Sequence, residues 1–325
     1  MKICLIGDGI TNQILAIFLA KRKIKVDLYS SFSKYDNKKT RTIGLTNNNK
    51  KFLEKNITNF GKLLWPINSI KIFNQSSQDK EVINFNKSKE AKFYMFKNNN
   101  LKNVIKTKLS KNKYFSLKKI KSNSFYSKII KMNYDIIINS DYNNIISSKF
   151  FNKKIDKDYK STAYTTIITH KSVHNHEASQ VFTNIGPLAF LPISNTKTSI
   201  VYSIKNSSNI RNENEVTKLI RKYNLKYSIL NLEKIEKFSV RSSFLKNYYH
   251  LNILAFGDLL HRVHPFAGQG FNMTIRDIKS FIKLIDDRVS LGLAIDKSLL
   301  HNFEKKNKSI NLIFGTGLDL VNQFF

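Results

Sequence analysis

The segment Ala255-Phe-Gly-Asp-Leu-Leu-His-Arg-Val-His-Pro-Phe-Ala-Gly-Gln-Gly-Phe-Asn-Met-Thr-Ile-Arg-Asp277 decides the fold. It begins as an apolar strand, passes Asp258 and a proline-bearing loop, and reaches a Gly268-Gln-Gly270 turn that opens an amphipathic helix. The first N–H groups of a helix lack partners within the helix, and its N-terminus is partially positive. Such a turn therefore suits a phosphate or an electron-rich ring edge. Asp258, at the strand end, is placed to hold a hydroxyl-bearing ligand.

A second glycine turn lies at the start of the chain. Lys2–Ile6 is a short apolar strand, Gly7-Asp-Gly-Ile-Thr-Asn12 is a tight turn, and the next ten or so residues have helical apolar spacing. Lys25–Tyr29 then predicts a second strand. This βαβ unit is the start of a Rossmann-type dinucleotide fold. Gly7 and Gly9 allow the sharp turn and the close approach of a pyrophosphate.

Two positions depart from the dinucleotide fingerprint. Asn12 stands where the third glycine is expected, so a side chain would intrude between helix and sheet. Ser30 replaces the acidic residue that grips a ribose, and Asp27 points to the other face because side chains alternate along a strand. The fingerprint alone does not distinguish FAD from NAD.

Length and composition describe a folded protein with two lobes. A chain of 325 residues is long enough for a large core, and 41% hydrophobic residues exclude wholesale disorder. The single cysteine, Cys4, excludes a disulfide scaffold and is expected to be a buried strand residue. No basic leader precedes the first strand and no apolar run is long enough to cross a bilayer, so we expect neither a signal peptide nor a membrane span.

The formal net charge of +32 raises the alternative of nucleic-acid binding. The lysines are scattered instead of forming one stripe with interleaved aromatic residues, and no RNA- or DNA-binding motif is present. We therefore expect no nucleic-acid partner. The positive field favours anionic ligands such as FAD and NAD(P)H and contact with anionic lipid headgroups.

The deciding segment closely resembles the third flavin-binding motif of the class A flavoprotein aromatic monooxygenases, in particular the ubiquinone-biosynthesis FAD-dependent hydroxylases. That resemblance implies an α/β, aromatic hydroxylase-like fold: a Rossmann-like FAD-binding domain with an inserted β-sheet substrate domain. The residues that stand at matching places are Gly257, Asp258, His261, His264, Pro265, Gly268, Gln269, Gly270, Asn272, Arg276 and Asp277.

Three further segments resemble the same family. Thr40–Thr46 places Arg41 near the flavin, with an exposed surface arginine as the alternative. Tyr134–Asp141 resembles a family strand that ends in an aspartate, and Asp141 stands at that position. Asn139 and Tyr142 replace the glycines that usually flank it. Val181–Pro192 is similar to a strand pair of the substrate lobe. The candidate pocket residues there are Phe182, Pro187, Leu188 and Phe190, for each of which a plain core role is the alternative.

The resemblance implies aromatic hydroxylation, in which reduced FAD activates O2 and one oxygen atom enters an electron-rich phenol ring. FAD and an electron donor, NAD(P)H or another, are the implied cofactors. The implied catalytic residues are His261, His264 and Pro265, and each histidine has a structural loop role as its alternative. The implied cofactor-binding residues are Gly7, Gly9, Arg41, Asp141, Gly257, Asp258, Pro265, Gly268, Gln269, Gly270 and Asn272.

We expect a discontinuous FAD-binding domain of residues 1–70, 101–160 and 241–288, a substrate domain of residues 71–100 and 161–240, and a C-terminal helix over 289–325. The family continues past this point with more helix. The implied substrate is a polyprenyl phenol or quinol precursor of ubiquinone, together with O2. We expect a cytoplasmic protein. The apolar tail of the substrate suggests peripheral contact at the inner face of the cell membrane. A ubiquinone-biosynthesis complex is a further candidate partner.

Other classes of function stay open or are disfavoured at this point. The changes at Asn12, Ser30 and Tyr142 suit a degenerate, non-catalytic subunit that keeps the fold. The histidines at 170, 174 and 176 lack a ligand set with recognised metal spacing, so we expect no metal. No Gly-x-Ser-x-Gly elbow supports a hydrolase.

Overall fold

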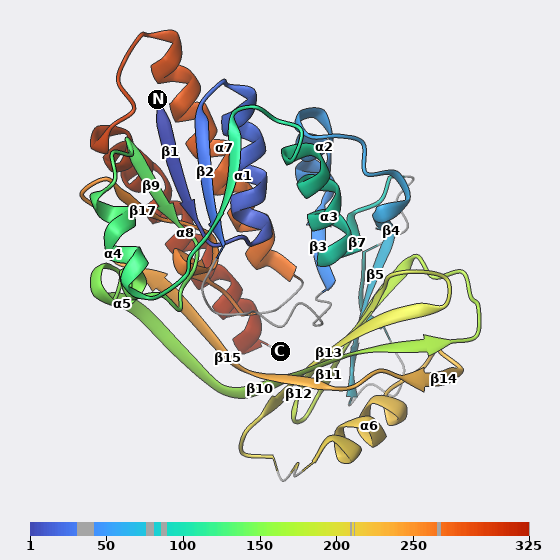
Figure 1. Cartoon of the computed structure of the whole chain (residues 1–325). Coiled ribbons are helices and arrows are strands. Elements are labelled where there is room, and N and C mark those ends of the chain that lie inside the picture. The colour runs from blue at the N-terminus through green and yellow to red at the C-terminus, as the bar shows by residue number, and fades with distance from the viewer. Residues whose placement is uncertain are drawn as a thin grey trace.

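A computed structural model describes residues 1–30, 42–75, 81–85, 90–208, 210, 212–264 and 268–324. For residues 81–85 and 320–324 it describes the backbone only. Two lobes are joined by a long pair of strands (Figure 1). Within the described residues, no helix has the length and apolar character needed to cross a membrane.

The first lobe, called the Rossmann lobe, is built on a six-stranded sheet in the order β16-β17-β9-β1-β2-β8. All neighbouring strands are parallel except β16 and β17, so the carboxyl ends of five strands lie at one edge. The bounds are β1 Lys2–Ile6, β2 Lys25–Ser30, β8 Phe115–Lys119, β9 Ile136–Asn139, β16 Tyr249–His250 and β17 Ile253–Ala255.

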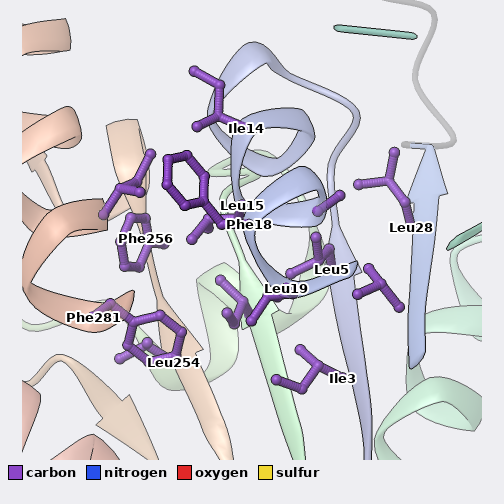
Figure 2. Close-up of a cluster of buried hydrophobic side chains, with 14 of the residues drawn as sticks. Ile3, Leu5, Ile14, Leu15, Phe18, Leu19, Leu28, Leu254, Phe256 and Phe281 are labelled. Carbon is purple, nitrogen blue, oxygen red and sulfur yellow. The ribbon is translucent and has the colours of Figure 1, made fainter. Parts of the chain in front are cut away.

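Helices cover both faces of this sheet. Figure 2 shows the main core, where α1 (Ile10–Lys21) packs its apolar residues against β1, β2 and β17. Phe256, just after β17, contacts Phe281 of α7 (Gln269–Ser290) and Phe303 of α8 (Lys297–Phe324). The opposite face meets α4 (Ser124–Lys131), whose Phe125 contacts Tyr29. The remaining helices of this lobe are α2 Asn47–Asn56, α3 Asn98–Leu109 and α5 Ile145–Phe150, with short 3-10 turns at Gly61–Leu63 and Gly257–Leu259.

The second lobe, called the sheet lobe, is a nine-stranded sheet with α6 (Glu213–Lys222) packed on one face. Leu188, Phe190 and Tyr202 are buried with Val216 and Ile220 of this helix. The strands run β18-β15-β10-β13-β12-β11-β5-β6, and β14 pairs with β10. Their bounds are β5 Ser69–Asn74, β6 Glu81–Phe85, β10 Lys154–His170, β11 Glu177–Thr183, β12 Gly186–Pro192, β13 Lys197–Lys205, β14 Ile229–Leu232, β15 Glu236–Leu245 and β18 His261–Arg262.

A three-stranded sheet lies between the lobes. Its order is β3-β7-β4, with β3 Thr42–Thr46, β7 Phe93–Lys97 and β4 Trp65–Ile67, all antiparallel. The Thr42 hydroxyl lies 2.6 Å from that of Ser199 in β13. The small sheet therefore ties the Rossmann lobe to the inner face of the sheet lobe.

The structure differs from the expected domain boundaries at three places. Residues 154–160, expected in the FAD-binding domain, begin β10 and pair with β15, because the strand pattern simply continues across the expected border. Phe93–Lys97, expected in the substrate domain, pairs with β3 instead of the large sheet. The tail is helical, but α8 begins at Lys297 because α7 continues to Ser290.

Candidate functional site

Three loops meet at the carboxyl edge of the Rossmann sheet. A methyl group on Gly7, where φ is +99°, would lie 3.1 Å from Ser140 Oγ and 3.3 Å from Asp141 Cβ. One on Gly257, where φ is +59°, would lie 3.2 Å from Thr11 Cγ2. The residues predicted from the first, second and third motifs are thus brought together, and both glycines are needed for their backbone angle and for space.

The turn that begins α7 docks on β3. Gly268 has φ +64°, and a Cβ there would lie 3.1 Å from the backbone nitrogen of Gly44. Asn272 fixes this contact, because its amide donates to the carbonyls of Gly44 and Gly268 and accepts from Thr46 N–H and Asn49 Nδ2, at 2.9 to 3.2 Å. The Asn272 side chain, which was predicted to bind cofactor, therefore holds the turn. The N–H groups of Gln269 and Gly270, in the first helical turn, lie at the positive end of α7.

The two predicted aspartates have different surroundings. Asp258 is exposed at the carboxyl end of β17, so its carboxylate is open to a hydroxyl-bearing ligand. Asp141 is buried and accepts the N–H of Asn143 at 2.9 Å, which shapes its own loop. Tyr142, found where a glycine was expected, is partly exposed and lies under the guanidinium of Arg262 at 3.8 Å. The tyrosine thereby links the β9 loop to β18.

Asn12 does not push the helix from the sheet. Its side chain is fully buried and Nδ2 donates to the carbonyls of Ile6 and Gly7, both at 2.8 Å. Because the amide nitrogen of Asn12 binds only carbonyl oxygens of the turn, the backbone N–H groups remain available to a pyrophosphate.

The ribose position also differs from the fingerprint. Ser30 donates to the carbonyl of Lys118 at 3.4 Å. Asp27 lies on the other face, as expected, and binds Lys118 at 2.7 Å, Lys2 at 3.0 Å and the Tyr134 hydroxyl at 2.6 Å. Burial opposes its ionisation, but these partners hold the pKa of Asp27 below its ordinary range. Asp27 is therefore a structural carboxylate inside the lobe.

The two candidate catalytic histidines are both buried. His261 Nε2 lies 2.5 Å from Asp277 Oδ2, and neither side chain has any exposed area. His264 places its ring edge on Tyr159 at 4.9 Å, and burial lowers the pKa of His264 to about 4. A histidine that is neutral at pH 7 and buried suits a structural role better than proton donation. The other two predicted residues, Arg41 and Pro265, lie outside the described residues.

One residue of this site was missed by sequence reasoning. Lys102 of α3 forms an ion pair with Asp8 of the β1–α1 turn at 3.8 Å, with 16% of its side chain exposed, and burial lowers the pKa of Lys102. A cation is thus held beside the glycine turn. The helix that carries Lys102 has a clear apolar stripe in the sequence, but the residues around Lys102 do not indicate an ion-pair partner 94 positions earlier.

The site fits an FAD molecule. A Cβ on Gly9 would meet nothing within 4 Å, which leaves room for a phosphate against the backbone. Three buried side-chain oxygens without hydrogen-bond partners, Asn12 Oδ1, Gln13 Oε1 and Asn98 Oδ1, lie at the first turns of α1 and α3. Buried acceptors need donors, which ligand hydroxyls or water would supply.

A cavity of about 210 Å³ lies beside the α7 turn, between the three-stranded sheet and the β12–β13 turn. Phe96, one of its lining residues, contacts Phe271 of the first turn of α7. The lining combines apolar side chains, such as Trp65 and Met95, with Lys62, Lys97 and Lys197. Of the earlier pocket candidates, Leu188 and Phe190 face α6 on the far side of the sheet, because alternation along β12 directs them there.

The histidine cluster has ordinary partners. His170 contacts the carbonyl of Lys171 and the Thr198 hydroxyl, and His176 binds the carbonyl of Pro66 and stacks on Trp65 at 4.6 Å. In the part of the chain that the structure describes, no three His, Cys, Asp or Glu side chains are grouped so as to hold a metal ion.

Comparison with known proteins agrees with this geometry. The model of the family described as FAD binding domain matches residues 143–290, which contain β17, Asp258 and the α7 turn. Over that part of the chain, the protein is similar to the FAD-binding domain of flavoprotein monooxygenases. Monooxygenase structures share its fold across nearly its whole length: p-nitrophenol 4-monooxygenase of Pseudomonas putida has a TM-score of 0.79 at 12% identity, over 98% of this chain and 87% of that chain. PqsL of Pseudomonas aeruginosa, in complex with 2-aminobenzoylacetate, gives 0.76 at 12% identity, over 98% and 95%. The expected fold class is confirmed.

Two curated relatives of the chain carry names from ubiquinone biosynthesis. The mitochondrial ubiquinone biosynthesis monooxygenase of Dictyostelium discoideum is 33% identical over 95 residues, which are 29% of this chain and 19% of that protein. The 3-demethoxyubiquinol 3-hydroxylase of Escherichia coli is 25% identical over 147 residues, 43% of this chain and 38% of that protein. The matches therefore cover less than half of either relative.

Proposed function

We propose that this flavoprotein hydroxylates the aromatic ring of a polyprenyl phenol or quinol intermediate of ubiquinone biosynthesis, using FAD, O2 and electrons from NAD(P)H or another donor. The observation that carries the proposal is the meeting of the Gly7 and Gly257-Asp258 turns at one sheet edge, together with the docking of the α7 turn on β3. The names of the curated relatives support the ubiquinone branch. FAD would supply the oxygen-activating chemistry when bound.

The side chains and backbone of the site have separate roles in this proposal. The turn at Gly7 and Gly9 would bind the pyrophosphate, with Lys102 nearby as a cation. Asp258 would accept hydrogen bonds from ribityl hydroxyls. The N–H groups at the start of α7 would lie against the pyrimidine edge and stabilise negative charge on the reduced ring. The cavity beside Phe96 offers apolar walls for an aromatic substrate and lysines for its oxygen substituent.

The test begins with the visible absorption spectrum of the purified protein before and after addition of FAD. Bound flavin bands at near-stoichiometric occupancy support the proposal, and substrate-dependent O2 consumption with quinol precursors then tests the substrate class. A protein that stays colourless in excess FAD contradicts the proposal. That result would favour the non-catalytic subunit, for which the changes at Asn12 and Ser30 are the specific observation.

We also propose a cytoplasmic location with peripheral contact at the inner face of the membrane, since a polyprenyl substrate resides in the bilayer and the chain is strongly basic. Co-sedimentation with vesicles that contain an anionic lipid, compared with vesicles of neutral lipid only, tests this contact. Equal recovery with both vesicle types would contradict it.

A further inference from the structure

One stripe of α8 faces the segment that leads into the α7 turn. Asn311, Gly315 and Asp319 follow one another at intervals of four residues, so they share one helix face. Each contacts a residue that in turn meets His261 or His264: Asp277, Phe244 and Tyr159, respectively. This segment has little support of its own, because β18 is only two residues long and pairs with β15 at two positions.

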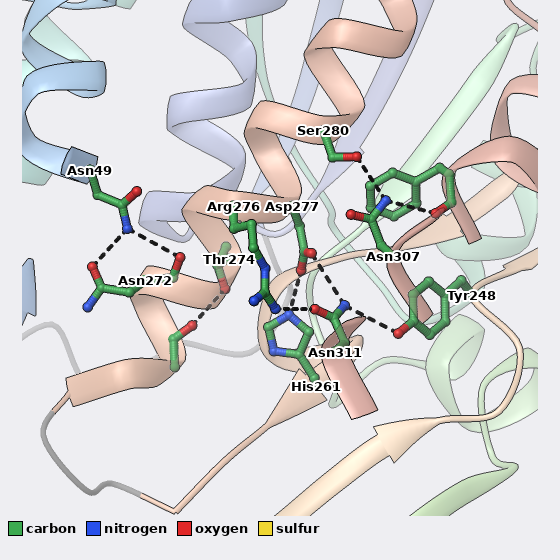
Figure 3. A network of polar contacts seen from close by, with 12 residues as sticks. Asn49, Tyr248, His261, Asn272, Thr274, Arg276, Asp277, Ser280, Asn307 and Asn311 are labelled. Carbon is green, nitrogen blue, oxygen red and sulfur yellow. Dashed lines mark hydrogen bonds and ion pairs between the residues drawn. The ribbon is translucent and has the colours of Figure 1, made fainter. Parts of the chain in front are cut away.

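Asn311 is the first contact of the stripe. It is fully buried, and Figure 3 shows its polar contacts with neighbouring side chains. Its Nδ2 donates to Asp277 Oδ1 at 3.3 Å and to the Tyr248 hydroxyl at 3.2 Å, and its Oδ1 accepts from Arg276 Nη2 at 2.6 Å. Asp277 in turn binds His261, the first residue of β18. A carboxylate buried this deeply needs all of its partners, since leaving a buried charge unpaired is costly.

Gly315 is the second contact. A Cβ at this position would lie 2.1 Å from the Phe244 ring, closer than any real contact, so the absence of a side chain is what lets α8 approach. Phe244 is the register partner of His261 in the β15–β18 pair. The helix is therefore linked to His261 by two routes, through Asp277 and through Phe244.

Asp319 is the third contact. Its carboxylate accepts a hydrogen bond from Tyr159 and forms an ion pair with Lys157 at 3.0 Å. The Tyr159 ring holds the edge of His264 at 4.9 Å. The stripe thus reaches both histidines between β17 and the glycine turn.

We propose that α8 is a positioning element of the flavin site: Asn311, through Asp277 and His261, and Asp319, through Tyr159 and His264, hold the β18 segment so that the α7 turn keeps its flavin-binding shape. The cofactor part of this inference rests on the proposed function. None of the three α8 residues touches the cofactor site. Loss of the contacts is expected to loosen the turn without removing any ligand-binding group.

A matched pair of variants tests the inference. Asn311→Ala removes the link to Asp277, whereas Asn307→Ala, one helical turn earlier, removes a buried amide that donates to Ser280 Oγ at 3.0 Å and to Phe303 O at 2.8 Å. Both losses weaken α7–α8 packing, so both are expected to lower the melting temperature of the cofactor-free protein. We expect the FAD dissociation constant to rise about tenfold in Asn311→Ala and to change less than twofold in Asn307→Ala, with a shift of the bound-flavin absorption band in the first only.

Amide hydrogen exchange of the cofactor-free protein gives a readout that needs no flavin. We expect faster exchange over residues 261–264 and 268–276 in Asn311→Ala but not in Asn307→Ala. If wild type binds no FAD, the proposed function fails while this comparison still tests the coupling. Equal effects of the two variants, or faster exchange confined to α8, would overturn the coupling. Should Asn311→Ala not fold, Asp319→Asn tests the same stripe with the same expected outcomes.

Discussion

At Asn12, one amide nitrogen donates to two consecutive carbonyl groups of the glycine turn, and its helix still packs on the sheet. The sequence pattern indicated a clash at this position because it compares side-chain size only. The amide instead donates to backbone carbonyl oxygens, which are not the groups that bind an anion. The effect of a motif departure on ligand binding therefore depends on which backbone groups the new side chain hydrogen-bonds.

Gly9→Ala separates binding from folding at the same turn. Gly9 has φ −63°, and nothing lies within 4 Å of an added Cβ, so the unfolding free energy should change by less than about 0.5 kcal/mol. The methyl group would fill the space of the pyrophosphate, and we expect FAD affinity to fall about tenfold, or about 1.4 kcal/mol. Gly257→Ala is the contrast, because φ +59° should cost about 1–2 kcal/mol of stability without FAD. Urea unfolding and flavin fluorescence titration measure the two quantities, and an unchanged FAD affinity in Gly9→Ala contradicts the assignment.

Asp258→Asn tests the ribityl contact. The side chain is exposed, so stability should stay within about 0.5 kcal/mol, while loss of a charged acceptor should weaken FAD binding by about 1.5–3 kcal/mol. Asp156→Asn, an exposed aspartate on β10, is the control that changes net charge equally. Isothermal titration with FAD compares them, and equal weakening in both variants would mean that only the overall charge matters.

His264 gives the protein a pH-dependent stability. Burial lowers the pKa of His264 from the ordinary 6.5 to about 4, so the fold favours the neutral ring. This contribution is complete above pH 6.5 and is lost as pH falls towards 4, up to about 3 kcal/mol. We expect the slope of unfolding free energy between pH 6.5 and 4 to flatten in His264→Phe and to persist in His301→Gln, whose histidine is exposed. An unchanged slope in His264→Phe would show that other groups cause it.

At the scale of elements, the regular parts were predictable from local pattern. Lys2–Ile6 forms the expected strand with the expected bounds, and the strand expected over Lys25–Tyr29 is β2 at Lys25–Ser30. Glycine turns were found because each needs a residue type that few others replace. The roles of the site residues as cofactor ligands stay predictions.

What the sequence did not reveal are partners far apart in the chain. Lys102 with Asp8, and Asn311 with Asp277, join elements whose registers against each other depend on the packed core. Asparagine in α8 looks like an ordinary polar helix residue, since nothing in its neighbourhood indicates burial. For Leu188 and Phe190 the core alternative agrees with the structure, and the sequence could not decide between the two roles because alternation gives two faces but not which one meets the cofactor lobe.

Two glycines of α8 test the docking of this helix. Gly315→Ala should cost about 1–3 kcal/mol, because the new methyl group would overlap the buried Phe244 ring. Gly317→Ala meets nothing within 4 Å and should stabilise by up to about 1 kcal/mol through helix propensity. Thermal and urea unfolding compare the variants. The close approach of α8 would be contradicted if both variants were stabilised alike.

At the scale of the whole molecule, a net charge of +32 should repel itself in the folded state. Raising NaCl from about 10 to 150 mM shortens the screening length from about 30 Å to about 8 Å. We therefore expect the melting temperature to rise by a few degrees, and the same concentration of a zwitterion to have less effect. A melting temperature that is indifferent to NaCl would mean that the charges are already compensated locally.

The pairing of β10 with β15 has a consequence for cooperativity. These strands share a ladder from Lys154↔Leu245 near the Rossmann lobe to Thr165↔Glu236 in the sheet lobe, interrupted by one shift of register between Asp158 and Thr162. Both strands belong to the sheet lobe, and their ladder extends back to the border of the Rossmann lobe (Figure 1), so paired backbone links the two lobes. We therefore expect the two lobes to unfold in one transition, and we expect any bending between them to be concentrated at the interruption in that ladder.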